Sequence, residues 1–202
     1  MEYKIKRRFI LGISLLLFAL LYFFKNTSSL LRIFATLAGL VSFYIFDHYF
    51  NINFELKHYL YILIIAFFGI LLSPLYFISE NYDKILHLVI PILTGGIVFF
   101  LVNKQNLTLK WKLVTTLLFT ISILTIFEVI EFSLDKLWDL KLQGIYIRDI
   151  TGLEKFNIIM DKNDDTMIDL IIGILGSLIF TFYNIIKSMI NRVKWSSRRF
   201  IK

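Results

Sequence analysis

Long apolar runs separated by short polar segments make up most of this chain. A run of about 20 apolar residues can cross the roughly 30 Å hydrocarbon core of a bilayer as one helix. We therefore predict an all-α fold, a polytopic transmembrane helical bundle of about six spans, forming a single membrane domain over residues 1–202. The expected spans cover residues 9–24, 30–50, 59–79, 84–102, 113–134 and 167–188.

Composition supports a membrane protein and excludes several kinds of chemistry. Hydrophobic residues make up 57% of the chain and charged residues 18%, compared with about 45–50% and about 25% in globular domains. The chain contains no cysteine, which excludes disulfides, thiol nucleophiles and thiolate metal ligands. Any chemistry must therefore come from carboxylates, imidazole, hydroxyls or amines.

Basic residues gather at the two ends of the chain, and the net charge is +7. Basic residues that flank apolar spans set membrane topology and contact anionic headgroups. No recognition helix or stacking platform accompanies them, so we expect no nucleic-acid partner. The terminal basic residues are Lys4, Lys6, Arg7, Arg8, Arg192, Lys194, Arg198, Arg199 and Lys202.

The distribution of Lys and Arg also predicts the orientation of the spans. Segments on the side of the N-terminus carry more basic residues than those on the other side, which predicts cytoplasmic termini and a multi-pass protein of the cell membrane. Residues 135–164 then form an extracytoplasmic loop or cap. Their mixture of acidic and apolar residues is typical of a folded cap or an interfacial helix.

Small residues and prolines lie inside several expected spans. Gly95 in the fourth span, with Gly173 and Gly176 in the sixth, provides small surfaces that permit close contact between helices. Pro74 and Pro91 fall within the third and fourth spans, where neighbouring helices and water can satisfy the released carbonyls.

Pairs of ionisable residues lie at the ends of three expected spans. Each such residue costs about 2.5–3.5 kcal/mol to insert into a membrane helix, so buried acids usually mark a functional site. Because successive spans alternate in direction, the start of the fourth, the end of the fifth and the start of the sixth share the outer boundary. Spacings of three or four residues place each pair on one helical face. The pairs are Asp83 with His87, Glu128 with Glu131, and Asp165 with Asp169.

Two kinds of chemistry suit this outer cluster. Carboxylate and imidazole ligands bind divalent cations, and such an ion, of unknown identity, would offset the repulsion among the acids. Without a metal, one crowded carboxylate would hold a proton near neutral pH and act as a general acid or proton carrier. The candidate metal ligands are Asp83, His87, Glu128, Asp165 and Asp169, and the candidate catalytic residues are Glu128, Glu131 and His87.

Ordinary structural roles compete with these assignments. Asp83, and either Asp164 or Asp165, are natural N-caps, because an aspartate at a helix start accepts backbone N–H groups. Lys84 and Arg148 are outer cations that could bind an anionic substrate, but we interpret them as solvated surface charges. The three polar residues between the second and third spans are interpreted as interfacial, and they are Asp47, His48 and His58.

The three acidic segments resemble the VanZ-like membrane proteins and, within them, the YjdF-like group. The matching segments are residues 82–87, 127–132 and 165–170, followed by Gly173 and Gly176. The resemblance covers about residues 80–180 and implies a helical, membrane-embedded protein with an acid and histidine signature. Its best-known member is associated with glycopeptide-antibiotic resistance, but the resemblance implies no particular reaction. The extended segment 135–164 departs from the usual pattern.

Three functions follow as hypotheses. The first is a metal-dependent hydrolase or transferase acting on a lipid or lipid-linked headgroup, since a metal-bound water supplies a nucleophile at neutral pH. The second is a proton- or cation-coupled transporter, although carriers usually bind substrate near the bilayer midplane. The third is a non-catalytic membrane partner subunit whose polar cluster serves helix association. The sequence indicates no oligomeric state.

Overall fold

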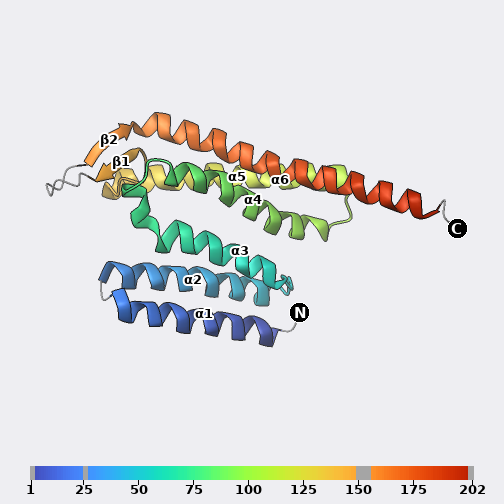
Figure 1. The fold of residues 1–202 in the computed structure, drawn as a ribbon, viewed down its shortest axis with the longest axis horizontal. Coiled ribbons are helices and arrows are strands. Elements are labelled where there is room, and N and C mark those ends of the chain that lie inside the picture. The colour runs from blue at the N-terminus through green and yellow to red at the C-terminus, as the bar shows by residue number, and fades with distance from the viewer. Residues whose placement is uncertain (1–2, 25–26, 149–155, 200–202) are drawn as a thin grey trace. The chain divides into compact units, whose positions relative to one another are not determined.

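The computed structural model describes residues 3–24, 27–148 and 156–199 (Figure 1). Six α-helices account for most of these residues, which confirms the all-α membrane bundle. A small two-stranded sheet joins β1 (Ile145–Arg148) to β2 (Phe156–Met160), where we expected a cap or an interfacial helix. The helices are α1 (Tyr3–Phe24), α2 (Thr27–Tyr49), α3 (Leu56–Ala66), α4 (Tyr82–Asn103), α5 (Leu109–Trp138) and α6 (Lys162–Arg199).

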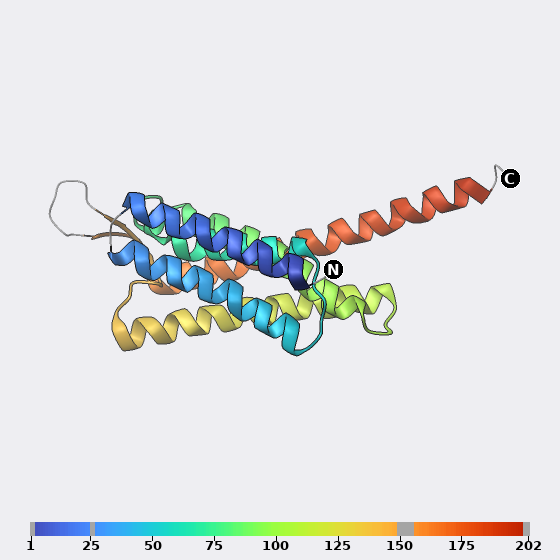
Figure 2. The same cartoon turned by 90° about the horizontal axis from the view of Figure 1, so that it is seen from below.

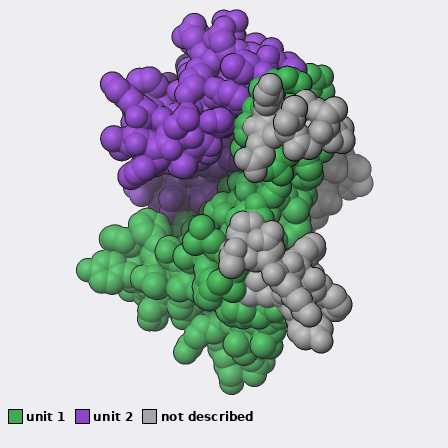
Figure 3. All heavy atoms as spheres, turned by 90° about the vertical axis from the view of Figure 1, so that its left-hand side faces the viewer, with its two compact units in different colours: residues 1–82, 147–157 green, residues 83–146, 158–202 purple. Residues whose placement is uncertain are grey.

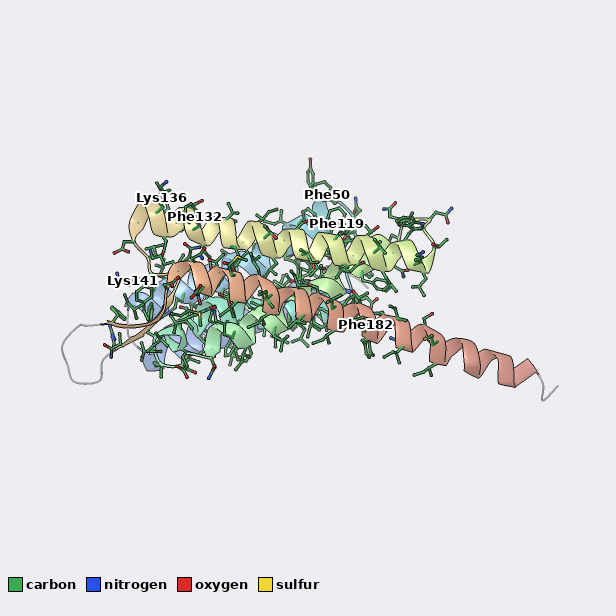
Figure 4. The ribbon with its side chains drawn as sticks, turned by 90° about the horizontal axis from the view of Figure 1, so that it is seen from above. Phe50, Phe119, Phe132, Lys136, Lys141 and Phe182 are labelled. Carbon is green, nitrogen blue, oxygen red and sulfur yellow. The ribbon has the colours of Figure 1, made fainter. Side chains whose placement is uncertain are left out.

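Four helices in the described part of the chain are long and apolar enough to cross a membrane. Helix α5 has 30 residues, about 45 Å at 1.5 Å per residue, so it is longer than the hydrocarbon core of about 30 Å. Phe119 and Phe132 on α5 and Phe182 on α6 point away from the ribbon (Figure 4) and are all more than half exposed. The four apolar segments are Leu30–Tyr49, Tyr82–Asn103, Leu109–Trp138 and Lys162–Asn191.

The chain divides into two compact units (Figure 3). Unit 1 comprises residues 1–82 and 147–157, and unit 2 comprises residues 83–146 and 158–202. Within unit 1, α2 packs against both α1 and α3 (Figures 1 and 2). Unit 2 contains α5, α6 and nearly all of α4, together with every residue predicted to bind a metal or to act in catalysis.

The helix expected over residues 59–79 is interrupted in the structure. After α3 the chain forms a π-helical turn, η1 (Phe67–Leu71), and then a 3-10 helix, η2 (Ser73–Phe77). Pro74 lies at the start of η2 and not inside an α-helix, contrary to our expectation. Proline donates no backbone N–H and disfavours helical backbone at the preceding residue, which explains the break. Pro91, as expected, lies inside α4.

Helix α6 packs closely against its two neighbours in unit 2. A Cβ atom added to Gly176 would collide with the backbone carbonyl oxygen of Leu88 on α4. A Cβ atom on Gly173 would collide with the side chain of Leu124 on α5. The predicted close packing at these glycines is confirmed, and it holds the helices that carry the candidate site at short separation.

A buried ion pair in unit 1 corrects our interpretation of Lys6 and Asp47. Both side chains are fully buried, and the Lys6 ammonium donates to the Asp47 carboxylate. The same carboxylate accepts hydrogen bonds from the Tyr59 hydroxyl at 2.6 Å and from the Phe54 backbone N–H at 3.1 Å. Lys6 therefore contacts a carboxylate on the next helix and not a headgroup, and Asp47 is not an interfacial residue.

His58 is also buried, at 1% exposed, so its interpretation as an interfacial residue was wrong. Its Nδ1 accepts the backbone N–H of Glu55 at 3.1 Å, which is one half of a capping box at the start of α3. His58 thus serves to begin a helix. His48 is exposed, in line with the expectation.

Candidate functional site

Helices α4, α5 and α6 bring the predicted acids and imidazole together at one end of unit 2. Ligand atoms of Asp83, His87 and Asp169 all lie within 4.8 Å of one another. A second group with the same spacing is formed by His87, Glu128 and Glu131. The two groups share the imidazole, so one residue of α4 links the carboxylates of α5 to that of α6.

Most of this cluster is removed from solvent. His87 is 5% exposed, Glu128 is 4% exposed and Asp169 is 1% exposed. Glu131 is only half-buried. Because buried charges are costly unless they are paired or coordinate a metal, the partners of each group decide what the cluster can do.

The two nitrogens of His87 face different carboxylates. Its Nε2 lies 3.4 Å from Asp83 Oδ1, and its Nδ1 lies 3.5 Å from Glu128 Oε1. Both His87 Nδ1 and Glu128 Oε1 are buried and have no hydrogen-bond partner among the described residues. An N–H···O hydrogen bond is normally about 2.9 Å, whereas two ligands about 2.1 Å from a tetrahedral ion lie about 3.4 Å apart. The observed spacing fits two ligands of one ion better than a direct hydrogen bond.

Lys84 is part of the cluster, and its interpretation as a solvated cation was wrong. Its side chain is 13% exposed, and its ammonium donates to Asp165 and, at 2.7 Å, to Asp169. Asp83 Oδ2 lies 3.4 Å from the same ammonium. The sequence placed Lys84 between two predicted site residues, but that position alone does not reveal that it points inward. Arg148, by contrast, is exposed as expected.

Asp165 has partners at both carboxylate oxygens. One oxygen accepts from Lys84, and the other accepts the backbone N–H of Gly144 at 2.7 Å. Gly144 has φ +88°, and a Cβ there would lie 3.2 Å from the Met160 carbonyl oxygen, so this approach requires glycine. Asp165 is also not an N-cap.

The start of α6 is capped by Asp161. Asp161 lies about one turn before Asp164 and Asp165, the two residues that we predicted as candidate N-caps. Its carboxylate accepts the backbone N–H groups of Asn163 at 2.9 Å and Asp164 at 3.0 Å. A helix that begins at Lys162 places Asp165 and Asp169 inside the helix, where their side chains can serve the cluster.

Asp135 is a supporting residue that the sequence did not identify. It is buried and accepts hydrogen bonds from the backbone N–H of Leu142 at 2.7 Å and from the Lys162 ammonium at 2.8 Å. Gln143 in the same segment donates to Thr166 on α6 at 2.8 Å. These contacts fix the segment after α5 onto the start of α6. A single acid at a helix end carries no sequence signal for this role.

Comparison with known proteins identifies a family. The model of a family described as a predicted membrane protein (DUF2238) matches residues 7–188. The chain belongs to this family. The match covers every residue of the cluster. The family description states that its members are membrane proteins but gives no function. It does not name the VanZ-like or YjdF-like groups. No curated protein and no solved structure matches.

In this DUF2238 protein the cluster has two chemically different halves. Around Lys84, the carboxylates of Asp165 and Asp169 already have a cationic partner. Around His87 Nδ1, Glu128 and Glu131 converge without a lysine or arginine partner among the described side chains. The second half is the part that could hold a cation.

Proposed function

We propose that this DUF2238 protein is a multi-pass enzyme of the cell membrane that uses a divalent cation to hydrolyse or transfer a lipid or lipid-linked headgroup at the outer leaflet. The observation that carries the proposal is the pair of buried, unpartnered atoms His87 Nδ1 and Glu128 Oε1, 3.5 Å apart. A cation between them would satisfy both atoms. It would also offset the charge of Glu128 and Glu131.

The ligand assignment follows from the two faces of the imidazole. His87 would bind the ion through Nδ1, with Glu128 and Glu131 as carboxylate ligands. Neutral imidazole carries its proton on the other nitrogen, Nε2, which faces Asp83 at 3.4 Å. A carboxylate in that position fixes the ring orientation and the tautomer of a metal-bound histidine. Asp83 is then an orienting residue. Asp165 and Asp169 pair with Lys84 and do not bind the ion.

Three protein ligands leave a coordination position for water, as in catalytic metal sites. A divalent cation would make that water a nucleophile at neutral pH. Glu131 is the most exposed of the three ligands, and a carboxylate bound through one oxygen can take the proton of the attacking water at the other. The water oxygen would form the bond to the headgroup phosphorus or acyl carbon as the bond from that atom to the departing oxygen breaks. Glu131 would then give the proton to the departing oxygen.

The surface next to this end of α5 suits a membrane headgroup region. Trp138 is 63% exposed and Leu137 is 68% exposed. Lys136 and Lys141 lie at the same end of α5 (Figure 4). Tryptophan and basic residues are enriched at the membrane–water boundary, where they contact headgroups. A substrate headgroup at this level would lie within reach of Glu131, about 10 Å along the helix from Trp138 at 1.5 Å per residue.

The resemblance to VanZ-like and YjdF-like proteins supports the same site. It rests on residues 82–87, 127–132 and 165–170, the segments that supply the cluster. A membrane-embedded acid and histidine signature agrees with a cation site. The resemblance supplies no substrate.

Replacing His87 by alanine, or Glu128 by glutamine, is expected to abolish binding of a divalent cation. Protein purified in detergent would be dialysed against Zn²⁺ or Mn²⁺, and the bound metal would be measured per chain. Asp164→Asn is the matched control, because Asp164 is an exposed acid on α6 beside Asp165. Full metal content in both site variants, or none in the wild type, would contradict the proposal.

The reaction is tested separately from the metal. Headgroup release from vesicles of phosphatidylglycerol and phosphatidylethanolamine should require the added cation. It should disappear in Glu131→Gln protein. Release that continues in the presence of a chelator would argue against a metal-dependent reaction.

Replacing Asp83 by asparagine is expected to weaken metal binding without removing a ligand. Loss of an orienting carboxylate typically lowers metal affinity about 10–100-fold. A metal titration of the variant should show this increase in the dissociation constant with unchanged stoichiometry. A complete loss of the ion would instead indicate that Asp83 is itself a ligand.

A cation-coupled carrier is the second candidate, and the burial of the cluster favours it. Asp169 and Glu128 are almost inaccessible to solvent, as expected of groups that bind an ion between helices. Ion-dependent solute flux into liposomes, lost in Glu128→Gln protein and accompanied by no headgroup release, would favour the carrier over the enzyme.

A further inference from the structure

The side chain of Lys84 forms ion pairs with three carboxylates of unit 2. Its ammonium contacts Asp165, Asp169 at 2.7 Å and Asp83 at 3.4 Å. The exposed fractions of the Asp165 and Asp169 side chains are 4% and 2%. A lysine ammonium is a compact point charge with three donors, so it can satisfy three carboxylates around one position.

The cluster contains more carboxyl groups than basic groups among the described residues. Its carboxylates exceed its cations, because Lys84 and, when protonated, His87 are the cationic side chains that contact them among the described residues. One ammonium cannot neutralise all of these acids, and a buried excess of like charge is costly. The acids are Asp83, Glu128, Glu131, Asp165 and Asp169.

The ammonium and the unpartnered atoms occupy different parts of the cluster. The Lys84 ammonium donates to one oxygen of Asp169 and to one oxygen of Asp165. The other oxygen of Asp165 accepts the backbone N–H of Gly144. His87 Nδ1 and Glu128 Oε1 remain without partners among the described residues. Asp83 lies between the two parts, 3.4 Å from both His87 Nε2 and Lys84 Nζ.

We infer that Lys84 is a tethered cation that fills a second cation position, formed by Asp83, Asp165 and Asp169, and thereby limits the centre to a single divalent ion. The inference rests on the proposed function for the location of that single ion. Many carboxylate sites hold two metal ions about 3.5–4 Å apart. Here the side-chain ammonium replaces one of them, so the number of metals is set by one residue of α4.

The test compares bound metal in the wild type with that in Lys84→Met and Lys84→Arg proteins. Methionine removes the charge from an unbranched side chain, whereas arginine keeps it. After dialysis of the full chain against Zn²⁺ at neutral pH, Lys84→Met should hold about one ion more per chain than the wild type. Lys84→Arg should hold the same number as the wild type.

A further variant shows whether the gained ion lies at the predicted position. Adding Asp169→Asn to Lys84→Met should remove the extra ion and leave the first. If Lys84→Met folds poorly without metal, Zn²⁺ should raise its melting temperature more than that of the wild type. Equal metal content and equal stabilisation by Zn²⁺ in Lys84→Met and wild type would overturn the inference.

The outcomes also separate this inference from the proposed function. A wild type without metal and a Lys84→Met protein with about one ion would refute the proposed centre at His87 and support the second position. A wild type with about one ion and no gain in Lys84→Met would leave the proposed function standing and refute the role of Lys84.

Discussion

Replacing Asp47 by alanine is expected to lower the free energy of unfolding by about 3–5 kcal/mol. This is the usual cost of removing one partner of a buried ion pair, because the other charge remains buried without compensation. In the variant the fully buried Lys6 ammonium would lose its carboxylate, and the Tyr59 hydroxyl and the Phe54 N–H would lose their acceptor. Denaturation of the purified protein in detergent micelles, followed by far-UV circular dichroism, measures the change.

Two controls separate the pair from general damage to unit 1. Lys4→Ala removes an exposed lysine from the same helix and should change stability by no more than about 0.5 kcal/mol. Lys6→Met combined with Asp47→Leu removes both charges and should recover much of the loss, as replacement of buried pairs by apolar residues often does. A loss below about 1 kcal/mol in Asp47→Ala would show that the pair is solvated and that its burial is not maintained in the membrane protein.

The helices could be predicted from the sequence because lipid imposes a simple requirement. A segment in the hydrocarbon core must satisfy its own backbone hydrogen bonds and expose apolar side chains, so a run such as that in residues 109–138 has few alternatives to a helix. The convergence of His87 with Glu128 and Asp169 follows from the same logic. Residues three or four apart share a helical face, and helices that alternate in direction bring their matching ends together.

The partners of the charged side chains could not be predicted in this way. Lys6 and Lys84 lie at helix ends, where a lysine that reaches a headgroup and a lysine that reaches a carboxylate on a neighbouring helix have the same sequence context. Which direction the long side chain takes depends on packing between helices that are distant in the sequence. The break at Pro74 was missed for a related reason, because proline inside an apolar run either kinks a membrane helix or ends it.

Replacing Gly176 by alanine is expected to lower the stability of unit 2 by about 1–3 kcal/mol, the range for overpacking a close contact. The added methyl group would collide with the carbonyl oxygen of Leu88, and backbone cannot move aside as a flexible side chain can. Gly173→Ala should cost less, because the atoms nearest to its methyl group belong to the side chain of Leu124 and not to backbone. Gly39→Ala is the matched control, since no described atom outside its own stretch of helix lies within 4 Å of a Cβ added at that position. Alanine is favoured over glycine in a helix by about 1 kcal/mol, so this variant should not be destabilised.

The same substitution should also weaken metal binding, although residue 176 touches no ligand. Leu88 follows His87 directly on α4, so a shift of α4 away from α6 would move the imidazole relative to Glu128. Metal ligands must be held within about 0.5 Å of their productive positions, and the 3.5 Å separation of His87 Nδ1 and Glu128 Oε1 leaves little tolerance. In Zn²⁺ titrations of the three glycine variants, Gly39→Ala should therefore bind the ion most tightly, Gly173→Ala less tightly and Gly176→Ala most weakly. Suppose that the three variants bind Zn²⁺ with equal affinity although Gly176→Ala is destabilised as expected. Metal binding would then not depend on the contact between α4 and α6, and the metal could not be bound by His87.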